Sequence, residues 1–200
     1  MFVRTPRLLL RPGFIEDAPA LAAAIGDEAI ARNLARLPWP YGVDDARTWL
    51  SQPADPLLPS MLMIQRTEGT PRIVGGIGIH RIDDAAGAAA GLEIGYWVAR
   101  PFWGLGFATE AGRAMLGLAR AHGLPRLASG HFIDNPKSGA VLRKLGFRPT
   151  GRIVPRYSLA RGCDVACALF EEGEDAGTGD MPPRLADDLH IRDRIRLLAA

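Results

Sequence analysis

A short glycine-rich segment, Trp103-Gly104-Leu105-Gly106-Phe107, joins an apolar run typical of a β-strand to a stretch typical of an α-helix. Two glycines separated by one residue let the backbone turn sharply and bring its N–H groups close to a ligand. The helix that they open adds the positive end of its dipole. The segment therefore predicts a site for an anion such as a pyrophosphate. An isolated Gly-x-Gly can also be an ordinary tight turn, so the neighbouring residues decide.

These neighbouring residues exclude two common nucleotide-binding motifs. A dinucleotide-binding fingerprint requires a third glycine or an alanine three residues after Gly106, and an acid about 20 residues further on. The chain has Thr109 and Arg126 at these positions. A P-loop requires Gly-Lys followed by Ser or Thr, and no such sequence follows the turn. We therefore expect neither a dinucleotide site nor a P-loop.

Apolar residues recur at strand-like or helix-like spacing along most of the chain. The clearest helix covers residues 108–121, and Gly146 stands where helix C-termini favour glycine. The patterns predict strands at residues 8–10, 61–66, 73–82, 91–98, 127–132, 152–159 and 164–170. They predict helices at residues 16–25, 28–37, 44–50, 108–121 and 136–145. This order indicates a mixed α/β or α+β sheet.

The composition indicates a single globular domain. Of the 200 residues, 48% are apolar and 23% are charged, which allows a sizeable core without a metal or a disulfide. Residues 171–183 are acidic and rich in Gly and Pro, as linkers are, and residues 184–198 have a helical pattern. We therefore expect one domain at residues 1–172, with a linker and a C-terminal helix within residues 173–200.

The distribution of charged and apolar residues argues against several classes of partner. The 24 basic and 22 acidic residues are spread along the chain, so no basic block marks a nucleic-acid-binding arm. No run of about 18 uncharged apolar residues marks a membrane helix, and we expect a cytoplasmic protein. Cys163 and Cys167 lack Cys or His neighbours at metal-ligand spacing, which predicts buried free cysteines and no metal site.

Residues 103–111, which read WGLGFATEA, resemble the W-G-x-G-[YF]-A-T-E-A segment of GNAT N-acetyltransferases of the RimJ/RimL branch. Residues 5–12, 92–98, 134–138 and 145–147 resemble further segments of that branch, so the resemblance runs from about residue 5 to residue 171. It implies the GNAT fold, with a central, mixed, mostly antiparallel sheet of six to seven strands flanked by helices. The cofactor cleft would lie between splayed strands four and five, here residues 91–98 and 127–132.

The same resemblance implies acetyl-CoA as cosubstrate, with its pyrophosphate on the glycine loop, and no metal. Asn135 would contact the pantetheine arm, although it could also serve only as the N-cap of its helix. The residues assigned to the cofactor are Val98, Trp103, Gly104, Leu105, Gly106, Phe107, Ala108, Thr109 and Asn135. Two positions depart from the family pattern. Pro101 stands where Gln or Arg is favoured, and Thr150 stands where RimL-like enzymes can carry an acid.

Acetyl transfer from a thioester to an amine needs a base, a donor for the carbonyl oxygen and a proton for the leaving thiolate. Glu93 lies inside an apolar strand, where a carboxylate requires a reason. It is either the base that similar enzymes carry there or a structural acid paired with an arginine. The resemblance assigns the carbonyl to a backbone N–H near Val98 and the thiolate proton to Ser138. A serine in a first helical turn can also be a capping or solvent-facing residue.

The acceptor amine is open at this level. A protein N-terminus is the acceptor that the RimJ/RimL resemblance favours, and a small-molecule amine such as a polyamine or an aminoglycoside is the alternative. A non-catalytic acyl-CoA-binding sensor would keep the glycine loop without a productive base. A monomer and a homodimer are both compatible with the sequence.

Overall fold

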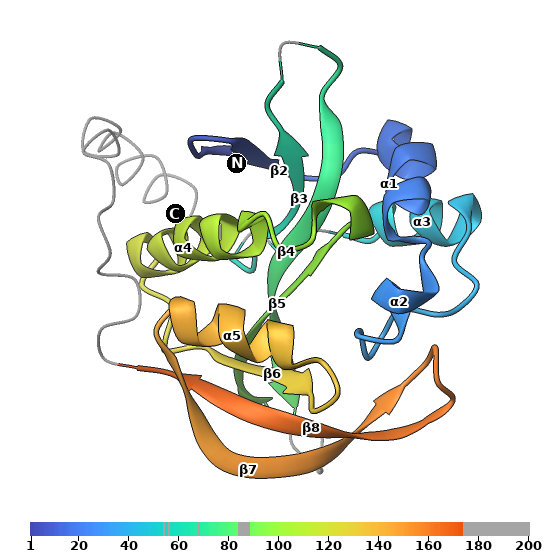
Figure 1. Cartoon of the computed structure of the whole chain (residues 1–200). Helices are drawn as coiled ribbons and strands as arrows, with labels where there is room; N and C mark the ends of the chain where they lie inside the picture. Colours follow the sequence, from blue (N-terminus) through green and yellow to red (C-terminus); the bar gives the residue numbers. More distant parts are fainter. Residues whose placement is uncertain (54, 56, 68, 84–88, 174–200) are drawn as a thin grey trace.

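The computed structural model describes residues 1–53, 55, 57–67, 69–83 and 89–173. They form one twisted eight-stranded sheet between two groups of helices (Figure 1). The strands are β1 (Val3–Arg4), β2 (Leu8–Arg11), β3 (Ser60–Gln65), β4 (Arg72–Asp83), β5 (Ala89–Val98), β6 (Ala128–Phe132), β7 (Phe147–Ser158) and β8 (Cys163–Glu172). The helices are α1 (Ala18–Ile25), α2 (Glu28–Ala31), α3 (Val43–Leu50), α4 (Phe107–Ala121) and α5 (Pro136–Lys144), with 3₁₀ turns at Ile15–Asp17 and Arg100–Phe102.

The sheet confirms the expected mixed, mostly antiparallel architecture. Its strand order is β1-β2-β3-β4-β5-β6-β8-β7, and every neighbouring pair is antiparallel except β5 and β6. The sheet has one strand more than the predicted upper number because Val3 and Arg4 pair with Leu10 and Leu9 as an additional edge strand. A two-residue strand has no periodicity from which it could be predicted.

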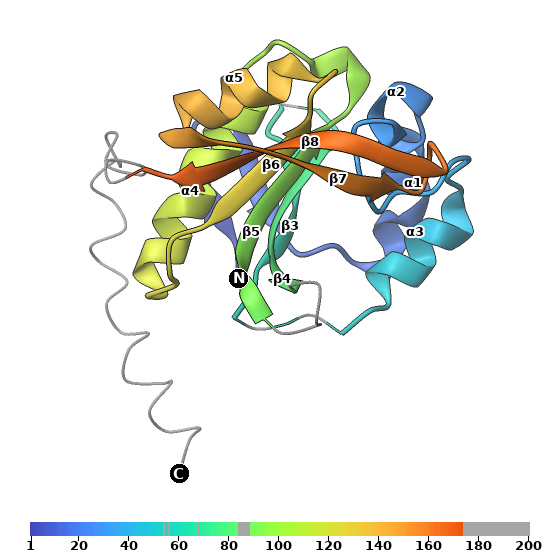
Figure 2. The ribbon, with the colours of Figure 1, turned by 90° about the horizontal axis from the view of Figure 1, so that it is seen from below.

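The helices divide between the two faces of the sheet (Figure 2). Helices α4 and α5 pack on one face, where Met115, Leu116 and Leu142 join a core of strand residues that includes Ile94. Helices α1 and α3 pack on the other face, in a second cluster that contains Leu62. Because α4 and α5 follow β5 and β6 directly, this arrangement brings the N-termini of both helices to the same end of the sheet.

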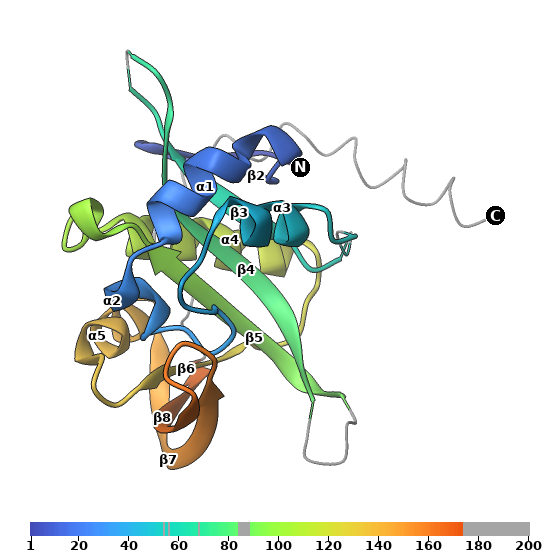
Figure 3. The same cartoon turned by 90° about the vertical axis from the view of Figure 1, so that its right-hand side faces the viewer.

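The helix predicted over residues 28–37 is wrong beyond Ala31, where α2 ends. The carbonyls that would continue it are used in tertiary contacts with the β7–β8 hairpin. Arg161 donates to the Arg32 carbonyl, and the Leu159 N–H donates to the Ala35 carbonyl at 3.0 Å. Figure 3 shows the tip of this hairpin beside the segment that follows α2.

Three further expectations concern the C-terminal segment, the cysteines and membrane helices. The predicted linker and C-terminal helix lie outside the described residues from residue 174 onward. Both cysteines are free, but Cys163 is exposed on β8 whereas Cys167 is buried as expected. In the described part of the chain, no helix is long and apolar enough to cross a membrane.

Candidate active site

The glycine loop has a backbone conformation that side chains rarely allow. Gly104 and Gly106 have φ angles of 79° and 83°, in the left-handed region that favours glycine. Gly106 is the N-cap of α4 and has no side chain to satisfy the first N–H groups of that helix. A Cβ atom at Gly104 would meet open space, so this side of the loop is accessible. The loop thus presents free N–H groups and the positive end of a 15-residue helix at one place.

The other loop residues divide into accessible and buried positions. The side chains of Phe107 and Ala108 are buried in the core, so these two residues can offer a ligand only their backbone N–H groups. Leu105 is exposed, and Thr109 is half-buried in the first turn of the helix. The Trp103 indole N–H donates to the Val98 carbonyl at 2.6 Å and so fastens the loop to the end of β5.

Strands β5 and β6 separate directly beside this loop. Their backbones pair at Glu93 and Ala128, and no further register pair joins these two described strands. The Ala99 N–H donates to the Val74 carbonyl on β4 at 2.9 Å. Because successive N–H groups of a strand point to opposite sides, the N–H of Val98 points away from β4. It therefore faces the opening between β5 and β6.

Two hydroxyl groups meet beside this opening, on the face of the sheet that α4 and α5 cover. The hydroxyl of Tyr96 on β5 lies 2.8 Å from the Ser138 hydroxyl on α5, and it lies 3.1 Å from the Ser138 carbonyl, to which it can donate. Burial raises the pKa of Tyr96 to about 12, against the lowering effect of the Ser138 hydrogen bond. Tyr96 therefore stays protonated at neutral pH. Asn135 is the N-cap of α5, but its side chain makes no capping hydrogen bond, which leaves its amide available.

Glu93 lies on the opposite face of β5 from Tyr96. Their positions differ by three, and successive side chains of a strand point to opposite faces. Its carboxylate is 5% exposed and accepts two hydrogen bonds from Arg156 on β7, at 2.8 and 3.2 Å. The Nε2 atom of His80, the residue opposite Glu93 on β4, lies 3.8 Å from the same carboxylate. The bidentate ion pair matches the structural role considered for Glu93.

The ionisation states of this cluster follow from its burial. Burial lowers the pKa of His80; Glu93 raises it, and Arg36 and Arg156 lower it further. Burial also raises the pKa of the Cys167 thiol nearby. At neutral pH the imidazole of His80 and the thiol of Cys167 are therefore both neutral beside the Glu93–Arg156 ion pair.

A small cavity of about 40 Å³ lies beside Arg156. Its wall also includes Asn33 from the segment after α2, Gly130 and Phe132 from β6, and Cys167 from β8. A cavity of this size has room for a water molecule, and Arg156, Asn33 and the backbone offer polar partners for it.

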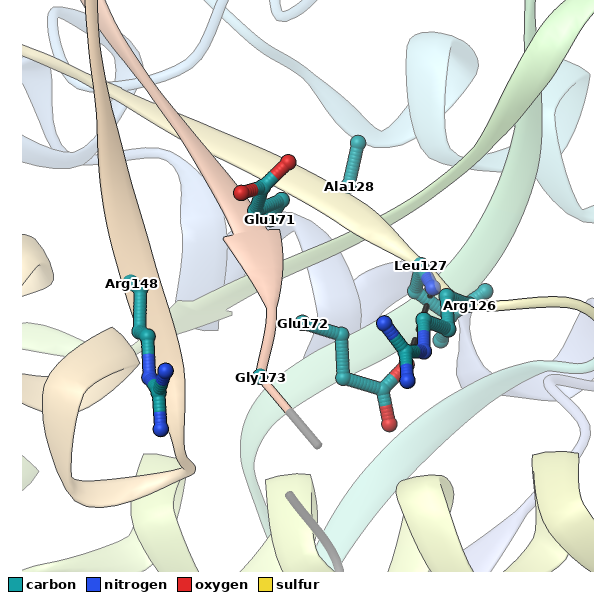
Figure 4. Close-up of a pocket in the computed structure, with 7 residues that line it drawn as sticks. All are labelled: Arg126, Leu127, Ala128, Arg148, Glu171, Glu172 and Gly173. Carbon is teal, nitrogen blue, oxygen red and sulfur yellow. Dashed lines mark hydrogen bonds between the residues drawn. The ribbon is translucent and has the colours of Figure 1, made fainter. Parts of the chain in front are cut away.

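A larger cavity of about 520 Å³ lies at the other end of β6 (Figure 4). Its lining includes Leu127, Arg148 and Glu172, and none of its lining residues was assigned to the site. Glu172 is buried, forms an ion pair with Arg120 and accepts a hydrogen bond from the Leu127 N–H at 2.9 Å. The lining contains no residue of the glycine loop, of α5 or of the end of β5, so the cavity lies apart from the opening there.

The family of the chain follows from its sequence over residues 7–148, which match the family model described as the acetyltransferase (GNAT) domain. This match covers more than half of the chain. The chain belongs to the GNAT acetyltransferase family. It is accordingly an acetyltransferase, and GNAT acetyltransferases use acetyl-CoA as the acetyl donor. Among the residues that the structure describes, no group of three or more His, Cys, Asp or Glu side chains could hold a metal ion.

Individual GNAT proteins resemble this chain over most of its length. The uncharacterized N-acetyltransferase YoaA of Bacillus subtilis (strain 168) is 26% identical over an alignment of 170 positions, which covers 80% of this chain and 89% of YoaA. The structure of the microcin C7 self-immunity acetyltransferase MccE, in complex with acetyl-CoA and AMP, has a TM-score of 0.68 at 20% identity and covers 84% of this chain and 93% of MccE. The structure of RimL, the ribosomal L7/L12 α-N-protein acetyltransferase, in complex with coenzyme A, also has a TM-score of 0.68 at 20% identity. It covers 88% of this chain and 99% of RimL. These structures show a shared fold.

Four side chains of this GNAT domain's site were not singled out from the sequence. They are Tyr96, whose partner Ser138 lies on α5, Arg156 and His80, which both contact Glu93 from other strands, and Arg7, which reaches the glycine loop from the residue before β2. A charged or hydroxyl-bearing residue within an apolar strand is the signal that Arg156 and Tyr96 share with Glu93. The partner of each could not be identified without the strand order.

Proposed function

We propose that this GNAT protein transfers the acetyl group of acetyl-CoA to a primary amine, as enzymes of the RimJ/RimL branch do. The observation that carries the proposal is the position of the glycine loop. Its free N–H groups and the N-terminus of α4 lie beside the opening between β5 and β6. A pyrophosphate on the loop would let the pantetheine arm enter this opening, with the amide of Asn135 available to it on α5.

The proposed chemistry uses groups on both sides of the opening. The amine loses its proton to Glu93, through a water molecule, and its lone pair attacks the thioester carbon. The Val98 N–H stabilises the negative charge on the carbonyl oxygen. The carbon–sulfur bond then breaks, and the departing thiolate takes the hydroxyl proton of Ser138. As the amide forms, its nitrogen releases its second proton, and Tyr96, hydrogen-bonded to Ser138, relays that proton to the Ser138 oxygen. Glu93 returns its proton to solvent.

The charges near Glu93 support a peptide N-terminus over a polycation as acceptor. Glu93 is already neutralised by Arg156, and Arg36 adds a positive charge close enough to lower the pKa of His80. A polyamine or an aminoglycoside carries several positive charges and would meet repulsion here. A single α-amine at the end of a peptide carries one positive charge and loses it before reaction.

An acceptor screen tests the proposed function. CoA release from acetyl-CoA would be followed with peptides of varied N-terminal residue, with spermidine and with aminoglycosides. We expect release with peptides that have a free N-terminus and no release with the same peptides blocked at that amine. Turnover with polyamines alone would contradict the proposed acceptor. Binding of acetyl-CoA without turnover on any amine would indicate the sensor.

The Ser138→Ala variant tests the proposed proton donor. We expect turnover to fall about 100-fold, within the range of general acid catalysis, while the dissociation constant of acetyl-CoA stays within twofold. Tyr96 keeps the Ser138 carbonyl as a hydrogen-bond acceptor at 3.1 Å, so the fold is preserved. Steady-state kinetics and calorimetric titration provide the two measurements. Unchanged turnover would remove Ser138 from the mechanism.

A further inference from the structure

Arg7, the residue before β2, contacts the glycine loop and the first turn of α4 from the side of the sheet. Its Nη1 atom donates to the Leu105 carbonyl at 2.9 Å, and its Nε atom donates to Glu110 at 2.6 Å. Its backbone N–H donates to the other Glu110 oxygen at 2.8 Å. Its guanidinium lies 4.5 Å from the centre of the Phe107 ring. One arginine thus holds three successive parts of the segment proposed to bind the pyrophosphate.

Glu110 makes this contact electrostatically important. It lies in the first turn of α4, where its charge would oppose an anion at the helix N-terminus. Burial alone would raise the pKa of Glu110, but hydrogen bonds from Thr5 and Arg7 outweigh burial and lower it. The carboxylate is therefore ionised at neutral pH. The Nε atom of Arg7 lies 2.6 Å from a Glu110 carboxylate oxygen and neutralises its charge. This contact removes a repulsive charge from beneath the loop.

We propose that Arg7 is a positioning residue for the cofactor loop, an inference that rests on the proposed function. It holds the Leu105 carbonyl toward the sheet, which leaves the N–H groups of the loop turned toward the cofactor. An exposed ion pair alone contributes little, but this arginine acts through several simultaneous contacts.

The test compares Arg7→Gln with Arg11→Gln. Arg11 lies at the end of β2, forms a bidentate ion pair with Asp17 at 2.6 and 2.7 Å, and has its guanidinium 5.2 Å from the Phe14 ring. Like Arg7, it therefore combines an ion pair with a carboxylate and a contact with an aromatic ring, but Asp17 and Phe14 lie outside the glycine loop. Binding of CoA and of pantetheine, which lacks the pyrophosphate, would be measured by calorimetry and by NMR titration.

We expect Arg7→Gln to raise the dissociation constant of CoA about tenfold or more and to leave that of pantetheine within twofold. Arg11→Gln should leave both constants unchanged even if it lowers the melting temperature as much. Equal weakening of CoA binding in the two variants would overturn the proposal, as would equal weakening of CoA and pantetheine by Arg7→Gln. If the native protein bound no CoA, the proposed function itself would fail.

Discussion

Gly104→Asp and Gly106→Asp variants are expected to lose the rise in melting temperature that acetyl-CoA gives the native protein. A carboxylate at position 104 would stand on the open side of the loop and repel the pyrophosphate. One at position 106 would add a negative charge at the N-terminus of α4, where its Cβ atom would lie 3.5 Å from the Arg7 guanidinium. Two unit charges about 4 Å apart near a protein surface repel by roughly 4 kcal/mol, which corresponds to about a 1000-fold loss of affinity. At 100 times the native dissociation constant, the native protein gains about 2.7 kcal/mol, and the variants should gain almost nothing.

Gly123→Asp is the matched control for these variants. Gly123 also has a positive φ angle, 67°, and a Cβ atom there would meet open space. It follows the C-terminal end of α4, so its substitution adds the same backbone strain and the same charge far from the loop. This control should keep the full acetyl-CoA-dependent shift. A full shift in both loop variants would place the cofactor elsewhere.

Glu93→Gln is expected to reduce turnover by a factor on the order of 10² to 10⁴ while the affinity for acetyl-CoA stays constant. Glutamine keeps the shape and most of the hydrogen bonding of glutamate, but it cannot take a proton from the amine. The deficit should shrink as pH rises, because a larger fraction of the acceptor amine is then already neutral. Turnover of the native protein and of the Glu93→Gln variant, each measured from pH 6 to pH 10, would show whether the deficit shrinks.

Glu172→Gln separates a catalytic role of Glu93 from a structural one. Glu172 is 3% exposed and is paired with an arginine as Glu93 is, but it lies on β8, where its carboxylate contacts Arg120 and the Leu127 N–H. Both variants remove one charge from a buried ion pair, so both should lose stability. Only Glu93→Gln should lose turnover in the fraction that remains folded. Equal activity of the two variants would assign Glu93 the structural role.

The sequence predicted the strands and helices whose periodicity is long. Residues 108–121 and 136–145 gave helices within one residue of α4 and α5, because their apolar spacing and their capping residues agree. The helix expected to continue to residue 37 ended at Ala31, because Arg161 and Leu159 compete for its carbonyls. These partners lie more than 120 positions along the chain, which no local pattern can reveal.

Residues of the candidate site could be predicted where the backbone conformation requires a particular residue type. Gly104 and Gly106 were identified because their conformation requires glycine, and the structure gives both a positive φ angle. Glu93 was identified as a carboxylate that needs a partner, but Arg156 could not be named as that partner. The two residues lie on β5 and β7, which are separated in the sheet by β6 and β8. Strand order and sheet curvature, which are global properties, bring them together.

The single backbone pair between β5 and β6 has a consequence for how such proteins diversify. Residues of the β7–β8 hairpin can be exchanged during evolution without disturbing the ladder that joins β1 to β5 or the turn that precedes α4. The part of the sheet that leads into the glycine loop and the part formed by β6, β8 and β7 can thus change at different rates. Glu93 and Arg156 form an ion pair between the two parts, so a lineage that replaces one of them must replace or compensate for the other.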